Sequence, residues 1–127
     1  MIAQVVAVLL GAPDAVVIAT PQDETRVPVV RERGPALAAP LLERPLGLTL
    51  TREGTGTTVR LGGATFHFQL GVPYVRTGSA VYSLVAAPYA LRDTVFLPLQ
   101  WLAEHVPRVL DERYRWDGAA GRLVELR

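Results

Sequence analysis

The chain has 127 residues, which is about the length of one domain. Half of the residues are hydrophobic and 20% are charged, a balance typical of a folded globular protein and not of a disordered one. With 13 basic and 12 acidic residues the net charge is +1, so the sequence lacks the basic excess of a nucleic-acid-binding protein. It contains no cysteine, which excludes disulfides, thiolate metal sites and cysteine nucleophiles.

Residues 1–14 form an apolar N-terminal segment that has two interpretations. Ile2 to Leu10 is apolar except for Gln4. As a helix this stretch would rise only about 13 Å, against about 30 Å of bilayer core, so we expect no membrane span. The segment is either a remnant of a secretory signal, cleaved near Ala12 or Ala15, or a strand that docks on this chain or on a partner.

Short apolar or alternating runs, separated by turn residues, predict a series of strands. The clearest pattern is at Ala64–Leu70, where Phe66, Phe68 and Leu70 alternate with polar side chains. Glycine-containing turns between neighbouring runs predict hairpins. The predicted strands are 15–19, 26–30, 46–52, 57–61, 64–70, 72–76, 80–84, 94–97, 113–117 and 122–126.

Two short helices are predicted, and each contains or precedes a proline. The first covers Ala36 to Arg44, and we expect Pro40 to weaken or kink it. The second covers Leu99 to Val106, and we expect Pro107 to end it. Its apolar face contains Leu99, Leu102, Ala103 and Val106. Its polar side contains Gln100, Glu104, His105 and Arg108.

Residues 15–61 and 80–126 read alike, as an internal repeat. In each, one strand precedes a second strand that ends near a proline, followed by a leucine-rich helix and a hairpin; Val27-Pro28-Val29 corresponds to Leu97-Pro98-Leu99. A unit of about 45 residues buries too little surface to be stable alone, whereas two units can share a core. We therefore predict an α+β fold of two similar halves, each a small, mainly antiparallel sheet with one short helix.

An ordered string of short motifs carries a family resemblance. The string contains Gly71-x-Pro73-Tyr74-Val75, Ala87-Pro88-Tyr89, Val95-Phe96-Leu97-Pro98-Leu99 and Tyr114-x-Trp116-Asp117. Together with a looser match around Val27-Pro28-Val29-Val30, it resembles the copper amine oxidase-like N-terminal domain family, also called the stalk domain. It is most similar to the version found ahead of the catalytic domain of some bacterial N-acetylmuramoyl-L-alanine amidases. The resemblance covers residues 15–126.

The resemblance implies a non-catalytic module of an exported bacterial protein, without copper and without amine oxidation. Because no hydrolase domain follows before Arg127, we expect no amidase activity. The favoured function is a structural or interaction subunit on the periplasmic face that docks onto an envelope or inner-membrane protein complex. A photosynthetic reaction centre with its antenna is one conceivable host, although no residue selects it. The alternative is a cell-wall module that binds peptidoglycan.

Residues capable of catalysis or metal binding do not form a recognisable motif. His67 and His105 lack metal-ligand spacing, and we expect both on the surface. The acidic residues lie beside turns and helix ends, where capping explains them better than paired-carboxylate chemistry. No nucleophile elbow surrounds Ser79 or Ser83, and the glycine-containing turns lack a nucleotide-binding fingerprint. We therefore predict no enzyme, no cofactor and no metal.

Aromatic and arginine side chains supply the candidate partner-binding residues. Trp101 lies off the apolar stripe of its helix, so we expect it to be partly exposed and to anchor a protein or stack on a sugar. Tyr89 is a second candidate for an exposed aromatic, whereas most other aromatics are expected in the core. Arg108, Arg113 and Arg115 are expected to form a small basic spot for a partner carboxylate, unless they only belong to a solvated face.

Overall fold

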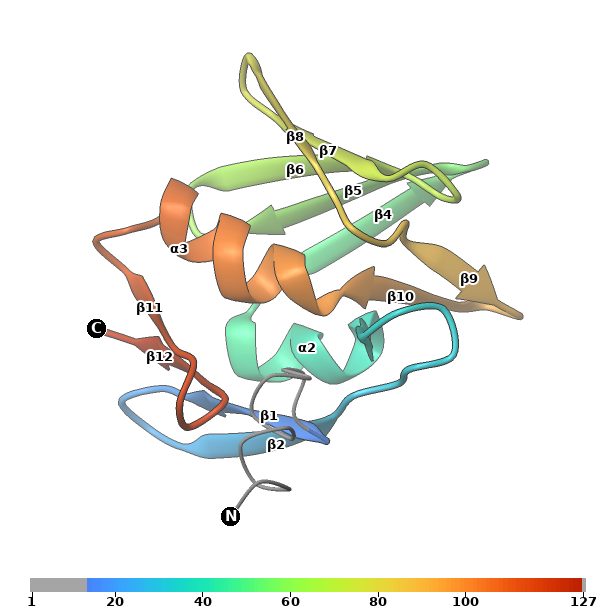
Figure 1. The fold of residues 1–127 in the computed structure, drawn as a ribbon. Helices are drawn as coiled ribbons and strands as arrows, with labels where there is room; N and C mark the ends of the chain where they lie inside the picture. Colours follow the sequence, from blue (N-terminus) through green and yellow to red (C-terminus); the bar gives the residue numbers. More distant parts are fainter. Residues whose placement is uncertain (1–13, 127) are drawn as a thin grey trace.

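The computed structural model describes residues 14–126 and has an α+β fold (Figure 1). Within these residues, 12 strands form three mostly antiparallel sheets, accompanied by two short α-helices. Apart from Asp14, the apolar N-terminal segment lies outside the described residues, so both interpretations of it stay predictions. In residues 14–126 no helix has the length and apolar character needed to cross a membrane.

A four-stranded sheet joins the two ends of the described chain, in the order β11-β12-β1-β2. Its strands are β1 (Ala15–Ala19), β2 (Glu24–Pro28), β11 (Tyr114–Asp117) and β12 (Arg122–Glu125). β1 pairs antiparallel with β2 and parallel with β12. The prediction of β1 is confirmed, whereas the second strand begins and ends two residues earlier than predicted. Pro28 ends β2 at an edge of the sheet, where its missing N–H costs no ladder hydrogen bond.

A three-stranded sheet has the order β3-β10-β9. Its strands are β3 (Ala36–Ala38), β9 (Tyr89–Leu91) and β10 (Thr94–Pro98). Leu37 of β3 is the register partner of Leu97 of β10, and both side chains are fully buried. The prediction that residues 36–38 begin a helix is therefore wrong. Pairing with β10 extends this segment, a long-range contact that a local pattern does not contain.

Two of the three sheets take strands from both predicted halves. β3 of residues 15–61 pairs with β10 of residues 80–126, and β1 pairs with β12. The prediction that each half has a sheet of its own is therefore wrong. Within the second half, β10 pairs with β9 and not with the strand at residues 80–83. Exchange of strands between the halves covers sheet edges that a separate unit would leave open.

The five-stranded sheet is an antiparallel meander in chain order. Its strands are β4 (Thr49–Glu53), β5 (Gly56–Leu61), β6 (Ala64–Gln69), β7 (Tyr74–Thr77) and β8 (Ala80–Ser83). The two predicted hairpins within residues 46–84 are confirmed. The predicted alternation in β6 is confirmed too, because Phe66 and Phe68 are buried while Thr65 and His67 are only partly so.

Helix α2 (Ala39–Leu46) begins three residues later than predicted. Ala38 is still extended, with ψ of 121°, and Pro40 falls in the first turn of the helix. At that position the missing N–H of a proline has no intrahelical partner to lose, so Pro40 starts the helix and does not kink it. Gly47 ends the helix in the left-handed conformation, with φ of 64°, which glycine adopts without a Cβ penalty.

The second helical segment contains a π-helical turn, η1 (Trp101–His105), which continues into α3 (Val106–Val109). The N–H of Val106 donates to the carbonyl of Trp101, five residues back. Pro107 follows this widened turn and does not end the helix, contrary to prediction. A proline removes one helical hydrogen bond and crowds the preceding turn, and a π-turn is a usual way to absorb such a defect.

The helices lie between the two larger sheets (Figure 1). The five-stranded sheet is at the top of this view and the four-stranded sheet at the bottom, with α2 and the orange helical segment in the middle. One apolar core joins side chains from all three sheets and from the helices. Residues 33–35 and 85–88, which connect strands, take part in lining a surface groove.

Candidate interaction groove

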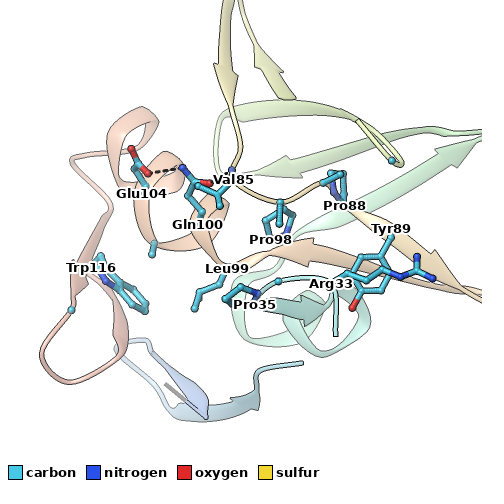
Figure 2. A pocket seen from close by; sticks show the side chains of 16 residues that line it. Arg33, Pro35, Val85, Pro88, Tyr89, Pro98, Leu99, Gln100, Glu104 and Trp116 are labelled. Atoms are coloured by element: carbon cyan, nitrogen blue, oxygen red, sulfur yellow. Dashed lines mark hydrogen bonds between the residues drawn. The ribbon is translucent and has the colours of Figure 1, made fainter. Parts of the chain in front are cut away.

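The described structure contains an open groove of about 1040 Å³. Segments that lie far apart in the sequence line it: residues 33–35, 71, 85–89, 98–100, 103, 104, 116 and 118. Figure 2 shows Trp116 and Tyr89 toward its two ends, with Leu99, Pro35 and Pro98 between them. The lining is mostly apolar, which is the usual character of a binding groove.

The loop at residues 33–35 forms one wall. The N–H of Leu99 donates to the carbonyl of Pro35 at 2.9 Å, which fixes this loop to the start of the second helix. The Arg33 guanidinium lies 4.8 Å from the centre of the Tyr89 ring, and that ring stacks on Phe96 at 5.0 Å. Arg33 is thus held over an aromatic face, as in a cation–π pair.

The segment Val85–Pro88 forms the opposite wall. The Val85 N–H donates to Oε1 of Gln100 at 2.8 Å, and the carbonyl of Pro88 accepts from the Gly71 N–H at 2.8 Å. These contacts hold the segment at both ends. The Val85 side chain is 90% exposed although it is apolar and beside the groove. Val85 thereby adds to the apolar lining of the groove, and a contiguous exposed apolar surface is typical of an interaction site.

A series of hydrogen-bonded polar side chains on the helix borders the groove. The Gln100 amide donates to Glu104 at 3.0 Å, and the Arg108 guanidinium reaches the other oxygen of Glu104 at 3.1 Å (Figure 2 marks the first contact). The Gln100 hydrogen bond, with the charges of His105 and Arg108, lowers the pKa of Glu104 below its ordinary value. Glu104 is therefore an ionised, hydrogen-bonded carboxylate and not a proton donor near neutral pH.

Trp116 lines the groove although it is not among the predicted partner-binding residues. It was expected inside the core with Tyr114, but it is only partly buried and lines the groove. A Cβ on Gly118 would lie 3.4 Å from Nε1 of Trp116, so the glycine leaves the indole close to the turn. The apolar run at residues 85–88, which no predicted strand contains, is the sequence feature that indicates this surface.

The prediction that Trp101 is partly exposed is wrong. Its side chain is 0% exposed and lies edge-on to Phe66 and Phe68, with ring centroids 5.4 and 5.7 Å away. A regular helix would place Trp101 off the apolar stripe, but the π-turn widens the stripe to include it. Tyr89 is also buried, with 5% exposure, so its predicted exposure is wrong as well. Neither residue is a surface anchor.

The three arginines are exposed, as expected, but two of them already have acidic partners. Arg108 pairs with Glu104, and Arg113 pairs with Glu125 at 3.2 Å. Arg108 also lies over the Tyr82 ring, whereas Arg113 lies over Tyr114. Arg115 is exposed on β11. A partner carboxylate would have to compete with these intramolecular pairs, and the role of the three arginines in binding stays a prediction.

The predicted surface position of His105 is wrong. The side chain is 2% exposed and stacks on Tyr82 with ring centroids 5.0 Å apart, because the π-turn brings it onto the buried face. His67 is half-buried, with Nδ1 3.4 Å from the Thr58 hydroxyl oxygen, and lies in a smaller hollow of about 590 Å³. Across residues 14–126, no three histidine or acidic side chains gather closely enough to hold a metal ion.

We expect the burial of His105 to make folding stability depend on pH. Burial lowers the pKa of His105 below its ordinary value of 6.5; the negative charge of Glu104 opposes this shift in part, and the positive charge of Arg108 adds a smaller lowering. As pH falls below about 6.5 the unfolded chain binds a proton that the folded chain does not, so the free energy of unfolding decreases. Thermal unfolding from pH 7.5 to pH 5.5 should show this decrease, and His105→Phe should reduce it. If the stability of the variant decreased with falling pH as much as that of the wild type, the pH dependence would not come from His105.

Gly34 permits a close approach between the two walls of the groove. Its φ is +86°, and a Cβ there would lie only 2.8 Å from the Cβ of Ala86. We expect Gly34→Ala to lower the free energy of unfolding by about 1–3 kcal/mol for the backbone strain alone, with the clash added to it. Gly71→Ala is the matched control, because its φ is +83° and nothing lies within 4 Å of the added atom. If urea unfolding gave the same loss of free energy of unfolding for both variants, residues 34 and 86 would not be in the close contact described.

The chain matches no family model, no curated protein and no solved structure. The resemblance to the stalk domain family accordingly stays a prediction that rests on the short motifs alone.

Proposed function

We propose that this chain is a non-catalytic, extracytoplasmic interaction subunit that docks onto a bacterial envelope or inner-membrane protein complex through the groove. The observation that carries this proposal is the apolar groove with Val85 exposed at its rim. Partner proteins usually contribute an apolar anchor to such a surface. The motifs shared with exported stalk domains favour a periplasmic location.

The predicted duplication is part of the same proposal. In both residue ranges a strand that ends near a proline, β2 or β10, precedes a helix and then a hairpin, β4–β5 or β11–β12. The strand predicted before the proline in the second range is β8, which pairs with β7 and not with β10. Two such units, joined by exchanged strands, would give a rigid frame around the groove, which suits a bracing subunit better than a mobile enzyme lid.

Co-purification of the full chain with its native membranes in mild detergent tests the proposal. We expect the protein to migrate with a large membrane complex, and Val85→Asp to release it into the soluble fraction. Val81→Asp is the matched control, because Val81 is also exposed, at 60%, but does not line the groove. Wild-type protein recovered as a lone monomer, or equal release of both variants, would contradict the proposal.

Binding of peptidoglycan is the second candidate, and the half-buried Trp116 favours it. An indole face beside amide and carboxylate groups, here Gln100 and Glu104, suits a sugar ring. Sedimentation with purified peptidoglycan tests this alternative. Strong binding that Trp116→Ala abolishes would support it, whereas no binding, or equal binding by the variant, would remove it.

A further inference from the structure

The smaller hollow, of about 590 Å³, lies where strands β6 and β7 separate. Only two residue pairs join these strands, and the last of them is His67 with Arg76. Beyond that pair the same register would place Thr77 opposite Phe66, but these two residues are not paired. In Figure 1 the tip of the β7–β8 hairpin accordingly rises above the five-stranded sheet. Residues of both strands and of the end of α3 line the space that this separation leaves.

The polar side chains that line this hollow can all donate hydrogen bonds, and two of them can carry a positive charge. They are Arg76, His67 and the hydroxyl-bearing Thr65 and Thr77. Because His67 and Arg76 are register partners, their side chains lie next to each other on one face of the sheet. Among the described residues, no acidic side chain lines the hollow. The lining is therefore complementary in charge to an anion.

Arg76 has no partner in the described part of the chain that would compete with an anion. The ion pairs found within residues 14–126 involve other arginines, namely Arg31, Arg108, Arg113 and Arg122. Arg76 is exposed, and no hydrogen bond to another described residue holds its guanidinium. A guanidinium presents a planar fork of N–H donors that fits the oxygens of a phosphate group.

The ring of His67 is held on the side away from Arg76. Its Nδ1 lies 3.4 Å from the hydroxyl oxygen of Thr58 in β5, and β6 lies between β5 and β7. When Thr58 donates to Nδ1, the neutral ring carries its proton on Nε2 and is a donor for a ligand. Gly63 and Gly78 also line the hollow, and a Cβ at either would have nothing within 4 Å. Free space therefore remains beside both turns.

We propose that this hollow is a binding site for a phosphate group. A carboxylate has only two oxygens, whereas a phosphate group offers at least three strong acceptor oxygens, which suits a guanidinium, an imidazole and two hydroxyls. The hollow has room for more than the ion alone, and Val109 and Leu110 give it an apolar wall that can hold the organic part of a phosphate ester. It shares no lining residue with the groove, so the site does not depend on the proposed docking function.

An NMR titration of the full chain with glycerol 3-phosphate tests the site, at fixed pH and with the ionic strength held by chloride. The chain has two histidines, and His105 is buried and does not line the hollow, so its ring signals are an internal control. We expect the ring signals of His67 to shift to saturation while those of His105 stay in place. Inorganic phosphate is the second ligand. Weaker binding of inorganic phosphate would assign the site to a phosphate ester, and equal affinity would assign it to the free ion.

Two arginine variants make the titration specific. Arg76→Gln should weaken binding about tenfold or more, because it removes a charged hydrogen-bond donor. Arg60→Gln is the matched control and should bind as the wild type does. Arg60 is exposed and is the register partner of Thr65, but it does not line the hollow. Shifts of His67 that never saturate, or equal weakening by both variants, would show only a general attraction of anions to basic side chains and would overturn the proposal.

Discussion

We expect Trp101→Ala to lower the free energy of unfolding by about 3–5 kcal/mol, because it empties a fully buried site in the core. Trp101 packs the helix against the five-stranded sheet, through its edge-on contacts with Phe66 and Phe68. Its Nε1 has no hydrogen-bond partner within the described residues, so the loss comes from packing and not from a hydrogen bond. Urea unfolding followed by circular dichroism measures it.

Two other variants make the Trp101 measurement specific. Trp101→Phe keeps an aromatic ring and should lose clearly less stability than Trp101→Ala. Trp116→Ala should also lose less, because Trp116 is only partly buried at the edge of the core. If Trp101→Ala were as stable as the wild type, the tryptophan would be exposed after all and the description of the π-turn would be wrong.

The second large effect is expected for Leu97→Ala, with a loss of about 2–5 kcal/mol in the free energy of unfolding. Leu97 is fully buried and is the register partner of Leu37, so it links strands from the two halves of the chain. The variant should still unfold in one transition, because both halves share the core.

Leu91→Ala is the control for Leu97→Ala. Leu91 also belongs to the three-stranded sheet but is 38% exposed, so we expect a change of less than about 0.5 kcal/mol. Calorimetry checks the cooperativity. Two separate transitions in Leu97→Ala, one for each half, would contradict the shared core.

Hairpins were the part of the fold that local patterns predicted best. A glycine turn between two alternating runs fixes the pairing of neighbouring strands, as in β4–β5 and β7–β8. The local pattern predicts a helix from residue 36, whereas residues 36–38 are extended. Their pairing with the distant β10 causes this, and a local pattern does not contain that contact. The three-residue β9 is too short to show a period of its own.

The candidate site was much harder to predict than the fold. A period of 3.6 residues places Trp101 and His105 outside the apolar stripe, and a sequence pattern does not show the single widened turn that buries both. The groove itself is lined by separate segments between residues 33 and 118, and only the folded chain brings these together. The position of Trp116, partly buried at the edge of the core and lining the groove, likewise depends on tertiary packing.

The most direct test of the proposed docking surface is the alkylation rate of single cysteines in the native membrane assembly. The chain has no cysteine of its own, so Val85→Cys and Val81→Cys each report on one exposed position. If the partner covers the groove, Val85→Cys should react much more slowly in the assembly than in the purified chain, while Val81→Cys reacts equally fast in both. Equal rates for Val85→Cys in the two states would contradict the proposal that the groove is the docking surface.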